Sequence, residues 1–562
     1  MTSTFSTINP RTNGRGYNPG MNTLFNLDYG REVPFNNLMK QSRDVWKRNA
    51  SDTFDGTLDA NGYITDGGTA LTHNQVVIIS SSIANMLPHG TYVLTWAGTG
   101  TPSLVKTGTM SVTETSSVSG RKTYSITDWG DGDLLYLRVP VADTDITDVV
   151  LCHEDYEGTC GPGEANEFYF EFVNLYKEFT GGIRFMNWLA TNQKDGWTDW
   201  ATRKTENYRT YTHGAFDGGT GRHAEPGVPL EVCIRMQNAL QVPAWYCIPH
   251  AYTDAAVDSY ADMLIANVDR GLKIGVEYSN ETWNPLFVQN SYCHTQGLAE
   301  QASTGRFDNQ NPSYPAWPWS AYRSTQIMRI IEPLFDAAGR GDDLTRIHCL
   351  QVGSNESANS LDAHVEVNYG VDAYEKPEDY HDSAAITFYW GGHTLKETQW
   401  SNNGAADNAG TFEGATKNTI NMSKEELYTW WETLCAYESN AATSTSWAWW
   451  KADIVDTRGL EMLGYEGQHH IVSSGAVVGV AAAQTIVGYY DEVRFGDLLQ
   501  TMIQCAVDNG FNTLMHFVAV EVASADGYWG LVPTYSDWPD IETYQRLRAV
   551  KHTAGHTNSR GI

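Results

Sequence analysis

Two patterns of apolar residues alternate along the chain from about residue 160 to the C-terminus. Phe168, Phe172 and Leu175 have the three- and four-residue spacing of a helix face, and the apolar run 182–186 that follows is typical of a buried strand. With an early run, the pattern predicts eight strands, at residues 20–25, 182–186, 244–250, 272–278, 346–352, 384–390, 460–465 and 511–517. Eight such units favour an α/β fold, a closed (β/α)8 TIM barrel, although an open doubly wound sheet would give much the same list.

Local end signals support two of the helices expected between these strands. Val257, Leu264 and Val268 have helical spacing, and Gly271 after them suits the residue that follows a helix C-terminus. A second helix is expected to begin at Ser423, because a Glu follows it three positions later, at Glu426, as in a capping box.

Residues 55–150 differ from the rest in being rich in Thr, Ser, Gly and Val. Short alternating runs at 75–80, 91–96 and 134–141 are separated by Gly-rich turns, the pattern of an all-β sandwich. This region lies between the first and second barrel strands, so we expect an inserted domain. The predicted organisation is residues 1–54 for the N-terminal segment with the first barrel strand, 55–150 for the β insertion and 151–562 for the rest of the barrel.

Composition narrows the function classes. The 562 residues include 67 acidic and 37 basic side chains, a formal charge of −30 that disfavours nucleic acid and anionic membranes as partners. No apolar run approaches the roughly 18 residues of a membrane span, and the polar N-terminus shows no signal peptide. Of eight cysteines, Cys152 and Cys160 alone are spaced for a local disulfide. Neither zinc nor calcium spacing is present, so no metal or cofactor is expected.

The most informative segment is Leu272–Asn284, a predicted strand that runs out into a loop carrying a carboxylate. Alternation places Glu277, Ser279 and Glu281 on one face, and Glu281 then lies at the C-terminal mouth of the barrel, where barrel enzymes act. An alternative is that Glu281 is a carboxylate near a helix N-terminus and stabilises the next helix.

A family resemblance adds weight to the first interpretation. The string GVEYSNETWN resembles the signature of a group of bacterial and phage-encoded glycosidase-like proteins, and Asn280-Glu281 is similar to the acid/base pair of clan A glycoside hydrolases. Gly20–Asn22 with the segment 34–43, and the run 182–188, resemble the group's first two strands. Glu466, in LGYEGQHH, stands where the resemblance implies the nucleophile, after the seventh strand.

The resemblance implies roles for several residues. Glu281 would be the acid/base and Glu466 the nucleophile, about 5 to 5.5 Å apart if the enzyme retains configuration. Arg184, His250 and Tyr389 would surround the nucleophile, with Arg184 and Tyr389 nearer Glu466 than Glu281, and Asn280 would hold the sugar 2-hydroxyl. Because the nucleophile must stay ionised, a positive or hydrogen-bonding shell is expected around Glu466.

Each supporting residue also has a structural interpretation. Arg184 would equally neutralise the interior Glu277, His250 would be a loop histidine, and Tyr389 would be a core tyrosine. Glu521, near the eighth strand, is the rival of Glu466 as nucleophile.

The sugar subsites have candidates as well. Trp529 resembles the tryptophan under the sugar in clan A barrels, and packing is the alternative for it and for every other candidate. The remaining candidates are Trp283, His393, His470, Trp188 and Trp390.

The sequence therefore predicts a retaining glycoside hydrolase that cuts a polysaccharide. The β region and the absence of a signal peptide suggest an extracellular or virion-associated phage depolymerase acting on bacterial exopolysaccharide or capsule. Homo-oligomer formation and attachment to a virion both stay open. A non-catalytic glycan-binding protein on the same scaffold is the alternative function, and a polysaccharide lyase ranks last.

Overall fold

The structure is a computed structural model. It describes residues 18–48, 52–69, 72–80, 86–129, 133–142, 144–212, 225–305, 307, 313–352, 379–390, 423–469, 488–521, 529–540 and 542–552.

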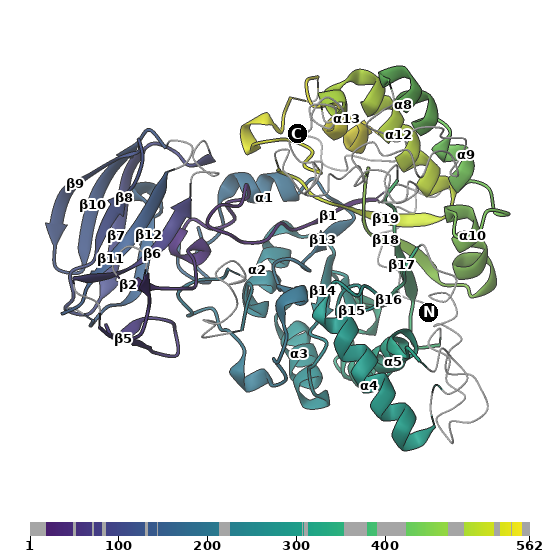
Figure 1. The fold of residues 1–562 in the computed structure, drawn as a ribbon, viewed down its shortest axis with the longest axis horizontal. Coiled ribbons are helices and arrows are strands. Elements are labelled where there is room, and N and C mark those ends of the chain that lie inside the picture. Colours follow the sequence, from purple (N-terminus) through teal and green to yellow (C-terminus); the bar gives the residue numbers. More distant parts are fainter. Residues whose placement is uncertain are drawn as a thin grey trace.

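Eight parallel strands form a closed barrel (Figure 1). The barrel closes because β1, its first strand, pairs both with the second strand, β13, and with the last strand, β19. In barrel order the strands are β1 (Asn18–Asn22), β13 (Gly182–Arg184), β14 (Ala244–Ile248), β15 (Ile274–Tyr278), β16 (Leu344–Cys349), β17 (Ser383–Thr387), β18 (Glu461–Gly467) and β19 (Phe511–His516). All eight predicted strands overlap these, and the closed barrel is confirmed over the open sheet.

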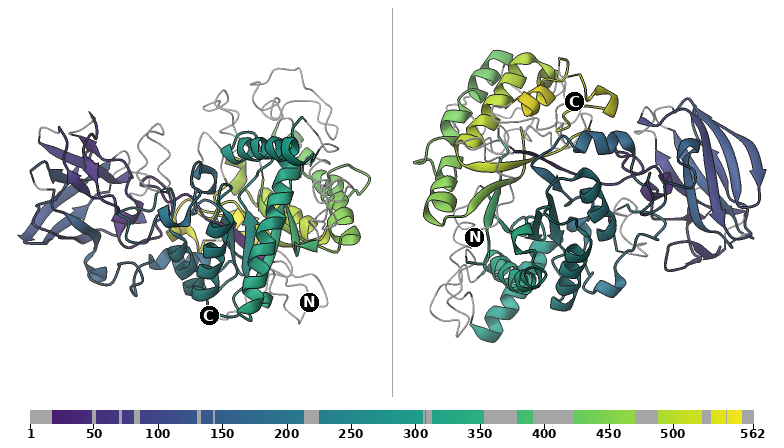
Figure 2. Two further views of the ribbon diagram at one scale, coloured as in Figure 1. Left: turned by 90° about the horizontal axis from the view of Figure 1, so that it is seen from below. Right: turned by 180° about the vertical axis from the view of Figure 1, so that it is seen from behind.

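The described helices lie around the outside of the strands, as the two views in Figure 2 show. They are α1 (Phe170–Tyr176), α2 (Leu230–Leu240), α3 (Asp254–Asn267), α4 (Val288–Thr304), α5 (Ala316–Ala337), α8 (Lys424–Trp431), α9 (Leu434–Glu438), α10 (Trp447–Lys451), α12 (Val493–Asp508) and α13 (Gln545–His552). Residues 353–378, between β16 and β17, lie outside the described part of the chain.

The two predicted end signals had different outcomes. The capping box of Ser423 and Glu426 is present, with both reciprocal hydrogen bonds. The prediction for Gly271 was wrong, because α3 ends at Asn267 and extended Val268 is its C-cap. Gly271 lies farther on, with a φ of +87° in the turn before β15.

Two antiparallel sheets come between β1 and β13 in chain order and lie beside the barrel (Figure 1). One has the order β12-β7-β10-β9, and the other has the order β3-β2-β6-β11-β8. Their strands are β2 (Lys47–Arg48), β3 (Asp52–Thr53), β6 (His73–Ser80), β7 (Gly90–Ala97), β8 (Ser103–Lys106), β9 (Ser111–Val118), β10 (Arg121–Thr127), β11 (Leu134–Pro140) and β12 (Thr147–His153), and β4 (Thr57–Leu58) pairs with β5 (Ile64–Asp66). The sheets thus extend beyond residues 55–150 at both ends.

The barrel interior changes from apolar to polar along its axis. An apolar cluster that includes Trp245, Leu463 and Met515 fills the middle. Toward the C-terminal ends of the strands, Asn22, Arg184 and other buried polar side chains replace it. Buried polar groups need partners, so this end holds a hydrogen-bonded network rather than an apolar core.

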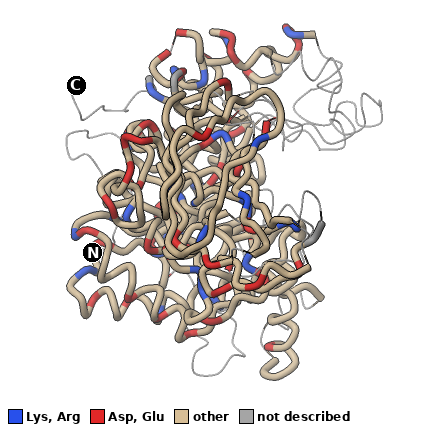
Figure 3. Tube along the Cα trace, turned by 90° about the vertical axis from the view of Figure 1, so that its left-hand side faces the viewer, with Lys and Arg blue, Asp and Glu red and all other residues tan. Residues whose placement is uncertain are grey.

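The surface carries both signs of charge, and Figure 3 shows acidic and basic positions interspersed along the described trace. None of the described helices combines the length and the apolar character that crossing a bilayer requires.

Glu32, in the segment after β1, is a buried carboxyl that supports this polar end. Tyr176 donates to its Oε1 at 2.6 Å, and the Leu24 amide donates to its Oε2 at 3.1 Å. Burial raises the pKa of Glu32 from 4.5 to about 8. The Tyr176 hydroxyl also lies 3.4 Å from the carbonyl oxygen of Asn22, so protonated Glu32 is part of the support of β1.

Glu32 should make stability depend on pH. The unfolded chain loses this proton near pH 4.5 and the folded chain near pH 8, so the free energy of unfolding falls as pH rises between these values. Glu32→Gln mimics the neutral acid and removes this contribution. Its stability relative to wild type, from urea unfolding followed by circular dichroism, should increase between pH 5 and pH 8 by on the order of a few kcal/mol. An equal difference at both pH values would contradict the account.

Candidate active site

Arg184, the last residue of β13, is the fully buried cation at the mouth of the barrel. Its Nη2 donates to both carboxylate oxygens of Glu277 on β15, at 3.1 and 2.8 Å, and its Nε donates to Oε2 at 3.2 Å. Trp245 Nε1 on β14, between the two strands, also donates to Glu277, at 2.8 Å. The structural interpretation of Arg184, neutralisation of Glu277, therefore holds.

The same guanidinium also reaches three groups at the mouth. Nη2 donates to Asn280 Oδ1 at 2.9 Å, and Nη1 donates to Asn22 Oδ1 at 3.3 Å. Nη1 also lies 3.8 Å from Glu466 Oε2. Arg184 therefore neutralises Glu277 and also lies next to Glu466 in the candidate site. Its contacts connect β1, β13, β15 and β18.

Glu281 follows β15 in a constrained loop. Ser279 and Glu281 have φ values of +59° and +39°, a left-handed conformation that costs a non-glycine residue about 1 kcal/mol or more. Hydrogen bonds from the start of α4 hold this loop, since Gln289 donates to the Asn280 carbonyl and Asn290 to the Thr282 carbonyl, both at 2.7 Å. Because α4 begins only at Val288, Glu281 is not in its N-terminal region, and that alternative was wrong.

Glu466 owes its direction to a β-bulge near the end of β18. Ile386 of β17 is opposite Gly464, but the next residue, Thr387, is opposite Glu466, so β18 has one extra residue there. A bulge of this kind redirects side chains. Tyr465 and Glu466, although consecutive, both reach the mouth, and Glu466 keeps 14% of its side chain exposed.

Each of the two carboxyls accepts a hydrogen bond from a different tyrosine. Tyr465 donates to Glu281 Oε1 at 3.2 Å, and Tyr389, which follows β17, donates to Glu466 Oε1 at 2.6 Å. Asn284 also donates to Glu281 Oε2, at 2.9 Å. Tyr389 is thus a partner of Glu466 as well as a buried residue, and the expected shell around Glu466 consists of Tyr389 and Arg184.

The surroundings of the two carboxyls differ in their electrostatics. Burial, and then the negative charge of Glu466, raise the pKa of Glu281 to about 8. Burial also raises the pKa of Glu466, but the charge of Arg184 and the hydrogen bond from Tyr389 oppose that rise. The surroundings therefore favour a proton on Glu281 and a charge on Glu466.

The orientation of Asn280 depends on a residue that sequence reasoning missed. Asn280 Nδ2 donates to Asn192 Oδ1 at 3.0 Å, and Gln289 Nε2 donates to the same oxygen at 2.6 Å. With Oδ1 of Asn280 facing Arg184, both ends of this amide are fixed. Tyr465 was missed too, although its position next to Glu466 was a usable signal. Asn192 gives no such signal, because it lies in a loop far from Asn280 in sequence.

His250, expected in the shell of Glu466, forms no hydrogen bond with either glutamate. Its side chain is 1% exposed, neither ring nitrogen has a hydrogen-bond partner, and burial lowers its pKa to about 4. The ring packs edge-on against Tyr292 of α4, with centroids 5.0 Å apart. His250 therefore contributes a neutral, buried ring beside the β14 loop.

The aromatic candidates separate into core and mouth positions. Trp188 and Trp390 are both 1% exposed and pack in aromatic clusters, so packing is correct for both. Trp283 lies two residues after Glu281 and is partly exposed. Trp529 is partly exposed beyond β19, with its ring against Phe517.

The other site candidates lie elsewhere. His393 and His470 are outside the described residues. Glu521, the rival nucleophile, accepts from the Trp529 amide at 3.2 Å and interacts electrostatically with Glu32. The charge that acts on Glu281 is that of Glu466, so Glu466 remains the better candidate.

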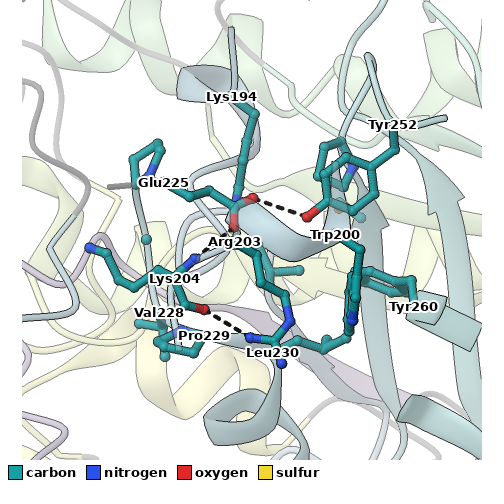
Figure 4. Close-up of a pocket in the computed structure, with 15 residues that line it drawn as sticks. Lys194, Trp200, Arg203, Lys204, Glu225, Val228, Pro229, Leu230, Tyr252 and Tyr260 are labelled. Carbon is teal, nitrogen blue, oxygen red and sulfur yellow. Dashed lines mark hydrogen bonds and ion pairs between the residues drawn. The ribbon is translucent and has the colours of Figure 1, made fainter. Parts of the chain in front are cut away.

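A small cavity is lined by residues of the loops after β13 and β14, and Figure 4 shows Lys194 and Tyr252 converging on Glu225 at its edge. Glu225 pairs with Lys194, accepts from the Tyr252 hydroxyl at 3.1 Å and accepts from the Lys204 amide at 3.2 Å. These bonds join the loops after β13 and β14, which carry Asn192 and His250.

No protein-family model matches the chain, and no curated protein matches it either. Among the residues that the structure describes, no group of three or more His, Cys, Asp or Glu side chains is arranged to hold a metal ion.

The ion pair of Arg184 and Glu277 should dominate the stability of this end of the barrel. Arg184→Met leaves Glu277 buried without its cation and should cost about 3–5 kcal/mol in the free energy of unfolding. Glu277→Gln should also destabilise, and the double variant should lose less than the sum of the two, as measured by urea unfolding.

The partly exposed pair of Arg235 and Glu167 is the matched control for this cycle. The coupling energy between its members should be smaller, because solvent screens a pair that water reaches. Equal coupling in the two pairs would contradict the central place given to Arg184.

Proposed function

We propose that the protein is a retaining glycoside hydrolase of the clan A type that cuts a polysaccharide, with Glu281 as the acid/base and Glu466 as the nucleophile. One observation carries the proposal. Two electrostatically coupled carboxyls follow or end different strands at one end of a closed barrel, and their surroundings favour a proton on Glu281 and a charge on Glu466. The resemblance of the segment around Glu281 to glycosidase-like proteins agrees with it.

Retaining hydrolysis needs one protonated and one ionised carboxyl. Glu281 donates its proton to the glycosidic oxygen as the bond to the leaving sugar breaks, and ionised Glu466 attacks the anomeric carbon to form a glycosyl-enzyme ester. Glu281, now ionised, then removes a proton from water, which attacks the same carbon and releases Glu466. Arg184 and Tyr389 stabilise the charge of Glu466 before the first step and after the second.

Substrate contacts follow from the same geometry. Asn280 donates one Nδ2 hydrogen to Asn192, and we propose that it donates the other to the sugar 2-hydroxyl. The partly exposed rings of Trp283 and Trp529 suit the apolar faces of sugars. We propose a bacterial exopolysaccharide or capsule as the substrate, and an extracellular or virion-associated place of action.

We further propose that strands β2–β12 form a sandwich domain inserted into the barrel that braces it rather than binds glycan. Trp96 and Trp129, the tryptophans of this region, are 8% and 4% exposed, so neither offers a face for stacking on sugar. Buried Arg209 donates to the carbonyl oxygens of Gly62 and Asp44 and thereby ties the first strands of this region to the loop after β13.

Substitution of either glutamate should stop hydrolysis. The protein is incubated with a panel of bacterial exopolysaccharides and capsules, and released reducing ends are measured. Glu281→Gln and Glu466→Gln should each lower the rate by about 10²- to 10⁴-fold or more, since each removes a group that acts on the reacting bond. Glu521→Gln is the matched control and should keep most of the activity. Hydrolysis at the wild-type rate by either of the first two variants would sink the assignment, and glycan binding without hydrolysis by the wild type would favour an adhesin.

The two tyrosines should each move a different limb of the pH profile. Activity requires protonated Glu281 and ionised Glu466, so kcat/KM should fall as pH rises through about 8 and as it falls toward the pKa of Glu466. A hydrogen bond to a carboxylate favours its ionised form, so removing the bond raises the pKa. Tyr465→Phe should therefore move the alkaline limb to higher pH, and Tyr389→Phe the acid limb to higher pH. A shift of the acid limb in Tyr465→Phe and of the alkaline limb in Tyr389→Phe would contradict the roles given to the two glutamates.

A further inference from the structure

Cys435 and Cys505 lie side by side where two helices pack. Cys435 belongs to α9 and Cys505 to the C-terminal part of α12. The Cys505 thiol lies 3.4 Å from the carbonyl oxygen of Cys435, and each thiol shifts the pKa of the other. Both are free cysteines in this structure.

The surroundings of this pair are polar. The Ser439 hydroxyl lies 3.5 Å from the Cys505 sulfur and also bonds to the Cys435 thiol. Asn509 Nδ2 lies 3.6 Å from the Cys505 sulfur and donates to Ser439 Oγ at 3.1 Å. The hydrogen bond from Cys505 lowers the pKa of Cys435 to about 7 and raises that of Cys505, which favours Cys435 as the attacking thiol.

Access distinguishes Cys435 from the other cysteines. Cys435 is partly exposed, whereas Cys505 is 3% exposed. Cys152 and Cys160 also hydrogen-bond each other, but they are 1% and 3% exposed, so both sulfurs of that pair are shielded. Cys349, although partly exposed, packs against the apolar cluster inside the barrel. An oxidant in solution therefore reaches the pair at Cys435.

We propose that Cys435 and Cys505 are a disulfide-forming site that reacts with a small disulfide such as oxidised glutathione. The Cys435 thiolate attacks one glutathione sulfur, and the first glutathione leaves as its thiolate. Cys505 then loses its proton to solvent and attacks the Cys435 sulfur, which expels the second glutathione. Two protein thiols are oxidised to one disulfide, and one glutathione disulfide is reduced to two thiols.

The disulfide would link the two helices that come before and after β18, the strand that carries Glu466. Helix α9 precedes β18 in the chain and α12 follows it, so the link closes a loop that contains the whole of this strand. A crosslink of this kind restricts the unfolded chain and stabilises the fold. The inference does not depend on the proposed function, because it uses no group of the candidate site.

Peptide mapping of the full-length protein tests the proposal. The protein is incubated with oxidised glutathione or with a reductant, its remaining thiols are alkylated in denaturant, and its digest is examined by mass spectrometry. The peptides of Cys435 and Cys505 should be linked after oxidation and both alkylated after reduction, and the oxidised form should melt roughly 2 °C higher or more.

Two single variants separate the steps. Cys505→Ser should accumulate a glutathione adduct on Cys435, whereas Cys435→Ser should leave Cys505 unmodified because it is buried. Cys152→Ser is the matched control and should leave the link unchanged. The proposal is overturned if Cys435 and Cys505 remain alkylatable after oxidation of the wild type, or if Cys152 and Cys160 are linked while they are not.

Discussion

The polar end of the barrel depends on the buried guanidinium of Arg184. A cation without solvent is stable only where partners replace the lost water, and Glu277 supplies most of that compensation through three hydrogen bonds. The remaining donors fix the amides of Asn22 and Asn280. One ion pair inside the barrel thus determines where the groups at its mouth can lie.

The inequality of the two glutamates follows from this arrangement. Glu277 already balances much of the charge of Arg184, and Glu466, which lies 3.8 Å from the guanidinium, gains more from the rest than Glu281 does. Glu281 is buried close to a second negative charge, and protonation is its less costly state. The bulge in β18 gives each glutamate its own tyrosine. Tyr465 hydrogen-bonds to Glu281, while its neighbour in the chain, Glu466, accepts from Tyr389.

Much of the fold could be predicted from the sequence because the barrel strands are buried on both sides and read as short apolar runs. The first sheet strand outside the barrel was not predicted, since Lys47–Arg48 is short and polar and is held by its backbone pairing with β3 and β6. The helix end predicted at Gly271 was wrong because a glycine with positive φ suits the turn before β15 as well as a helix end. Glu281 and Glu466 were candidates because a motif and strand positions identify them. Asn192 and Gln289 could not be found, since contacts across loops leave no periodic trace in sequence.

The arrangement at the mouth of the barrel requires that Glu281 carries a proton at neutral pH beside an ionised Glu466. Titration of the protein with carbon-13-labelled glutamate carboxyls, followed by NMR, measures this without a substrate. Two carboxyls, those of Glu32 and Glu281, should titrate near pH 8. The Glu281 signal should be absent from Glu281→Gln, persist in Glu32→Gln, and shift to lower pH in Glu466→Gln, where the neighbouring charge is gone. Titration of Glu281 near its ordinary pKa of 4.5 would contradict the account.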